Sequence, residues 1–65
     1  MTGTNALDNA DRAIDRAGGA LDEAKYLMIS WEHAPQEDRP AIKRKLLAEL
    51  DAAADAAAEA RKHLE

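Results

Sequence analysis

Three acidic residues in the C-terminal half have the spacing of a weak cation site. Asp51, Asp55 and Glu59 recur every four residues, which places their carboxylates on one face of a helix. Carboxylate oxygens are ligands that Ca²⁺ and Mg²⁺ accept, but like charges on one open helix face repel each other. We therefore interpret this stripe as a solvated surface, and we predict no metal and no cofactor.

The two histidines have no neighbours that would make them catalytic or metal-binding. His33 directly follows Glu32, so the two side chains point in different directions on a helix and lack the Glu-x-x-His spacing of a di-metal bundle. His63 lies near the other end of the chain. Because there is also no cysteine nucleophile and no glycine-rich phosphate loop, we predict that the protein is not an enzyme and assign no catalytic residue.

A short basic segment offers a second kind of chemistry, the binding of phosphate. Lys43, Arg44 and Lys45 are consecutive, and Arg39 precedes them by one helical turn. The formal net charge of the chain is -4, however, which opposes attraction to nucleic acid. A nucleic-acid-associated regulator that uses this segment is therefore an alternative to the main interpretation below.

Apolar residues at alternating intervals of three and four predict two helices, each with one apolar stripe. Pro35 and Pro40 separate the two stretches, because proline interrupts a helix or stands in its first turn. A short connection between helices makes them antiparallel neighbours. The first stripe contains Leu7, Ala10, Ile14, Ala17, Leu21, Ala24, Met28 and Trp31, and the second contains Ile42, Leu46, Leu50, Ala53, Ala57, Ala60 and Leu64.

The predicted fold class is all-α, an antiparallel two-helix hairpin that forms a single domain at residues 5–65. Residues 1–4 are expected to be disordered, since the first good helix-capping residue is Asn5. The expected boundaries are a first helix at about 5–33, a connection at 34–39 and a second helix at about 40–63.

A hairpin of this size has little apolar surface with which to hold its fold. The chain has 65 residues and no cysteine, and alanine makes up most of its 46% hydrophobic content. Chains this small usually need a disulfide, a metal or self-association. We therefore predict a homodimer in which two hairpins form a four-helix bundle. The residues expected at its interface are Ala13, Ala20, Leu27, Leu47, Ala54 and Ala58.

The segment from Tyr26 to Trp31 has apolar residues on every side of the predicted helix. One stripe cannot bury all of them, and an exposed aromatic patch is typical of a protein-binding surface. We therefore interpret the chain as a small regulator or inhibitor that binds an unidentified partner protein. A purely structural, self-assembling protein remains an alternative, in which the oligomer covers the patch. The predicted partner-binding residues are Asp22, Tyr26, Leu27, Ile29, Trp31 and His33.

Two consecutive glycines lie in the middle of the first predicted helix. Gly18 and Gly19 each lower helix stability by roughly 1 kcal/mol relative to alanine. They could break the helix into two, which would give a three-helix arrangement, or they could allow another backbone to approach closely. The sequence leaves these alternatives open.

The sequence also bears on where the protein acts. No apolar run approaches the roughly 20 residues that a membrane-spanning helix needs. The N-terminus lacks the basic start and apolar stretch of a signal peptide. We therefore expect a cytoplasmic protein without a membrane partner.

Overall fold

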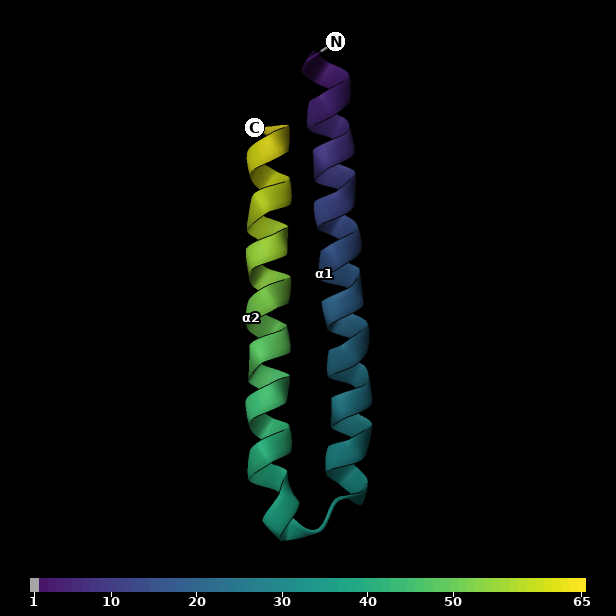
Figure 1. Ribbon diagram of the computed structural model, residues 1–65, viewed down its shortest axis with the longest axis vertical. Coiled ribbons are helices and arrows are strands. Elements are labelled where there is room, and N and C mark those ends of the chain that lie inside the picture. Colours follow the sequence, from purple (N-terminus) through teal and green to yellow (C-terminus); the bar gives the residue numbers. More distant parts are fainter. Residues whose placement is uncertain (1) are drawn as a thin grey trace.

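The chain folds into two long helices that lie side by side and run in opposite directions, as Figure 1 shows. The computed structural model describes residues 2–65, and describes side chains from Asn5 onward. Helix α1 spans Thr2–His33, the 3₁₀ turn η1 spans Gln36–Asp38 and helix α2 spans Arg39–Leu64. No strand occurs in this part of the chain. The predicted all-α hairpin is thus confirmed, with both termini at one end and the turn at the other.

The helices extend slightly beyond their expected boundaries. Helix α1 begins at Thr2, so residues 2–4 belong to the helix, where the sequence suggests a disordered start. Met1 lies outside the described residues. No proline stands between Thr2 and His33, so no backbone N–H beyond the first turn is missing from the helical hydrogen bonds. Helix α2 gains one residue at each end relative to the expected 40–63.

The turn between the helices is built from backbone hydrogen bonds and two prolines. Pro35 is extended, with φ of -59° and ψ of 154°, and its carbonyl accepts a hydrogen bond of 3.0 Å from the Asp38 N–H. The Ala34 N–H donates to the Trp31 carbonyl over 3.3 Å, which ends α1. Pro40 stands in the first turn of α2, where a missing N–H costs no helical hydrogen bond.

A cation–aromatic contact closes the hairpin just above the turn. The guanidinium carbon of Arg39 lies 6.0 Å from the centre of the Trp31 ring. Both side chains are half-buried, so each covers part of the other. This contact fixes the start of α2 against the last turn of α1.

The seam between the two helices is lined by alanine. The buried residues of the described chain are Ala10, Ala13, Ala24, Ala53, Ala56 and Ala60. The half-buried Ala17, Ala20 and Leu27 complete the row on α1 with the same alternation of three and four residues. Because a methyl group needs little room, alanine lets the two backbones approach closely, but it removes little apolar surface from water.

This seam differs from the predicted stripe on α1 at every second position, where it uses the residue one earlier in the sequence. The prediction combined alanines such as Ala10 and Ala24, which the structure buries, with larger residues that it leaves exposed. Where the prediction used Ile14 and Leu21, the seam uses the preceding residues, Ala13 and Ala20. The exposed members of the predicted stripe are Leu7, Ile14, Leu21 and Met28, between 47% and 63% exposed.

The glycine pair does not interrupt the fold. Helix α1 continues through Gly18 and Gly19, and both residues are exposed. A Cβ atom added at either glycine would have no neighbour within 4 Å. Within the hairpin, therefore, neither glycine is required for a close approach.

Over the described residues, neither helix is long and apolar enough to cross a membrane.

The alanine seam predicts that a larger side chain at its centre is destabilising. Ala13 is 0% exposed, so Ala13→Leu must push the helices apart and should lower the free energy of unfolding by about 1–3 kcal/mol. The same change at the exposed Ala58 serves as the matched control and should alter stability by less than about 0.5 kcal/mol. Urea denaturation followed by circular dichroism measures both. Equal effects at the two positions would contradict the seam.

Candidate functional site

The outer side of α1 carries a small exposed patch with an aromatic residue at its centre. Asp22, Tyr26, Ile29 and His33 follow each other at intervals of three or four residues, so they share one side of the helix. Tyr26 is 69% exposed and Ile29 is 55% exposed. With Lys25, the first three line a shallow hollow to which α2 contributes nothing. We call Asp22, Tyr26, Ile29 and His33 the outer patch.

Two residues predicted for the same site lie elsewhere. Leu27 is half-buried and lines a hollow with Lys45 and Glu49 of α2, so it belongs to the region between the helices. Trp31 is half-buried under Arg39 at the turn. The structure thus brings together the four exposed members of the predicted set, and it uses Leu27 and Trp31 to hold the hairpin.

The residues predicted for self-association are also divided by the fold. Ala13, Ala20 and Leu27 lie in the seam and already pack against α2 within one chain. Leu47 and Ala54 are exposed on α2 and are free of the seam. Ala58 is exposed as well, four residues beyond Ala54. Only the α2 members of the set therefore have side chains that a second copy could cover.

A larger apolar surface, which the sequence reasoning missed, covers one broad side of the hairpin. Besides the residues named above, the seam includes the half-buried Ala6, Leu46, Glu49 and His63. Each residue of the larger surface follows a seam position by one residue, and in an antiparallel pair those positions lie on the same side of both helices. All of them are exposed. A recurrence at every seventh residue was the signal for the α1 row. We call this surface the apolar face: Leu7, Ile14, Leu21 and Met28 of α1 with Leu47, Leu50, Ala54, Ala57 and Leu64 of α2.

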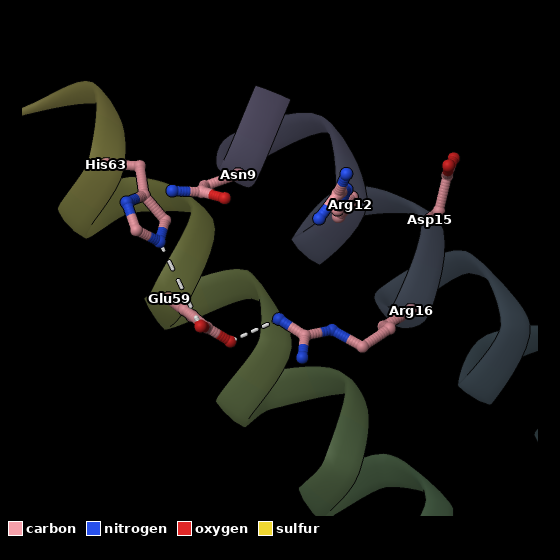
Figure 2. Close-up of a pocket in the computed structure, with 6 residues that line it drawn as sticks. All are labelled: Asn9, Arg12, Asp15, Arg16, Glu59 and His63. Atoms are coloured by element: carbon pink, nitrogen blue, oxygen red, sulfur yellow. Dashed lines mark hydrogen bonds and ion pairs between the residues drawn. The ribbon is translucent and has the colours of Figure 1, made fainter. Parts of the chain in front are cut away.

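The opposite broad side is polar and carries an ion pair between the helices. In Figure 2, Arg16 of α1 extends towards Glu59 of α2, and a guanidinium nitrogen of Arg16 donates to a carboxylate oxygen of Glu59. The Nε2 atom of His63 lies 3.9 Å from the other oxygen of Glu59, whereas Asp15 points away from the pair. Because Arg16 and Glu59 are both about half exposed, water screens the pair, and we expect it to add no more than about 1 kcal/mol.

In the folded chain one residue of the acidic stripe is paired, and the side chains of the basic segment diverge. Glu59 is paired with Arg16, and among the described residues no group of three His, Cys, Asp or Glu side chains could hold a metal ion. Lys43, Arg44 and Lys45 are consecutive on α2, so their side chains leave the helix about 100° apart. They face three different directions and offer no single basic surface.

Comparison with known proteins does not assign a role to either surface. No protein family matches the chain, and no similar curated protein or solved structure is found. The function must therefore be argued from these surfaces themselves.

Proposed function

We propose that the protein is a non-enzymatic protein-binding module, a small regulator or inhibitor, that works as a homodimer. The observation that carries this proposal is the distribution of apolar side chains. The buried residues of the described chain are six alanines, whereas nine large apolar side chains are at least 43% exposed. A folded protein normally buries its large apolar residues first, so these exposed side chains are expected to be covered by other chains.

Self-association accounts for seven of those nine side chains, the large residues of the apolar face. Covering a half-exposed Leu, Ile or Met contributes roughly 1 kcal/mol, about half the value for full burial. Seven such side chains on each of two copies give a gain on the order of 10 kcal/mol. Association costs about 4–15 kcal/mol before any contacts are counted, so the gain is of the size that a dimer needs.

The remaining two, Tyr26 and Ile29, support the binding of a different protein. They lie on the outer patch and not on the apolar face, so a second copy on the apolar face leaves them open to solvent. Tyrosine is among the residues that contribute most to binding energy at interfaces. Asp22 and Lys25 beside them supply a charged rim that would orient a partner.

Removing the two apolar side chains of the outer patch should abolish partner capture. We expect the double variant Tyr26→Ala, Ile29→Ala to lower recovery of the partner from host lysate more than tenfold, because truncating a central aromatic anchor typically costs 2 kcal/mol or more. Pull-down with quantitative mass spectrometry measures the recovery. The helix content and melting temperature should stay close to those of the unchanged protein, because both side chains are exposed.

A matched control comes from the same helix. The double variant Asn9→Ala, Arg12→Ala also changes two exposed residues of α1, but at least ten residues before the outer patch, and should keep full partner recovery. If the Tyr26 and Ile29 variant stays folded and still captures the same proteins as the control, the outer patch is not the binding surface. In that case the purely structural role becomes the better interpretation.

Self-association should be visible in the concentration dependence of unfolding. Since a dimer loses stability on dilution, the melting temperature should fall as the protein is diluted from hundreds of micromolar to about one micromolar. Light scattering at the higher concentration should give about twice the chain mass of 7.1 kDa. A 7.1 kDa species with a melting temperature independent of concentration would rule out the homodimer.

A further inference from the structure

We propose that the apolar face binds a second copy of this chain with the two hairpin turns at opposite ends, so that α1 packs against α1 of the second copy. This inference rests on the self-association proposed above and specifies its surface and its direction. It is carried by the register of the two helices, the size of the face and the placement of its charges.

Each helix presents two separate seams. The first is the alanine seam, which packs the two helices of one hairpin together. The second consists of the residues that directly follow those of the alanine seam in the sequence, and it contains the apolar face and its edges. One residue corresponds to about 100° around a helix, and a four-helix bundle of roughly square section needs two seams about 90° apart on each helix. The second seam contains Leu7, Asp11, Ile14, Gly18, Leu21, Lys25 and Met28 on α1, and Lys43, Leu47, Leu50, Ala54, Ala57, Arg61 and Leu64 on α2.

The face has the area of a stable dimer interface. The Cα atoms of the hairpin span 53 Å along the helices and 13 Å across them, which corresponds to a rectangle of about 700 Å². Stable protein interfaces bury roughly 800 Å² on each partner. The face therefore has the size that a stable interface with one other copy needs.

The second seam of α1 can pair with the same seam of another copy that runs in the opposite direction. Leu7 and Met28 lie equally far from the middle of the row, as do Ile14 and Leu21. In an antiparallel pair of α1 helices, each of these apolar residues therefore meets an apolar residue of the other copy.

The charged residues of this seam follow the same symmetry to within half a residue. Asp11 and Lys25 each lie seven residues from Gly18, on opposite sides of it. The antiparallel pair therefore places Asp11 of each copy beside Lys25 of the other, and two pairs of opposite charge form across the two-fold axis.

Lys43 also meets negative charge in the arrangement with the turns at opposite ends. There it lies near the C-terminal end of α2 of the second copy. Glu65 and the negative end of the helix dipole are found there.

Gly18 gives a direct test, because it lies where the two-fold axis crosses the α1 pair. A Cβ atom at Gly18 meets nothing within 4 Å in the hairpin, so Gly18→Cys leaves the fold intact. The natural chain has no cysteine that would complicate the result. Gly19→Cys is the matched control, since Gly19 has the same free space but is turned about 100° from Gly18, away from the apolar face.

Under mild oxidation, Gly18→Cys should form a disulfide-linked dimer in high yield, seen as a doubled mass on a non-reducing gel. Gly19→Cys should remain a single chain under the same conditions. An equal mixture of Gly18→Cys and Ala54→Cys chains should give only the 18–18 and 54–54 products, because the antiparallel arrangement keeps Gly18 away from Ala54 of the second copy.

Three results would overturn the inference. A dimer by light scattering whose Gly18→Cys variant does not crosslink would exclude this face or direction while leaving self-association standing. A dominant mixed 18–54 product would show that the turns lie at the same end. A chain that is monomeric by light scattering would remove both the inference and the homodimer of the proposed function.

Charge reversal tests the direction without a covalent bond. Lys25→Glu places a second negative charge beside Asp11 of the other copy, at two places in the dimer. This change should raise the dissociation constant of the dimer on the order of tenfold. Adding Asp11→Lys to that variant should restore the original value, as expected for residues in contact. Failure of the second change to restore binding would mean that Asp11 and Lys25 do not meet.

Discussion

The fold depends on the alanine seam between α1 and α2. Six buried alanines let the helices approach closely, and this close contact decides which way every other side chain points. Since helical neighbours differ by about 100°, seating alanine between the helices turns the leucines, isoleucine and methionine of the next position onto one broad side. The hairpin is therefore well defined in shape but has placed most of its apolar surface outside.

That outcome divides the molecule into three surfaces with different chemistry. The polar broad side holds the Arg16 and Glu59 pair, which joins the helices but stays hydrated. The apolar face on the other side runs along the hairpin with charged residues such as Asp11 and Lys25 at its edge, and it suits the same face of another copy. The outer patch stands apart from both, with Tyr26 and Ile29 among charged neighbours. Separate surfaces allow self-association and partner binding to occur together, which is the basis of the function we propose.

The hairpin itself could be predicted from the sequence, because its signals are local. Pro35 and Pro40 mark the turn, and the three-and-four spacing of apolar residues marks both helices. The two expected helices are present, and their ends differ from the predicted boundaries by at most three residues. Continuity of α1 through Gly18 and Gly19 was left open, since the cost of glycine does not decide by itself between a bend and a straight helix.

The register of the seam could not be predicted in the same way. Ala10 belongs to a regular apolar row whether it is continued through Ala13 or through Ile14, so periodicity does not distinguish the two rows. Only the packing of both helices against each other selects the smaller residues. The same ambiguity explains why the candidate site could be predicted only in part. Tyr26 and Ile29 lie outside both rows and are exposed, whereas Leu27 and Trp31 pack within the hairpin.

The central claim is that the hairpin hides its apolar face against another copy, and the two isoleucines on α1 test it most directly. Ile14 on the apolar face is 54% exposed in the single hairpin, and Ile29 on the outer patch is 55% exposed. In a monomer, therefore, water reaches both side chains equally. Their methyl NMR signals can be compared in the presence of a soluble paramagnetic agent, which broadens signals of groups that contact water. We predict strong broadening of Ile29 and protection of Ile14 at concentrations where the dimer forms. Equal broadening of the two would contradict the account.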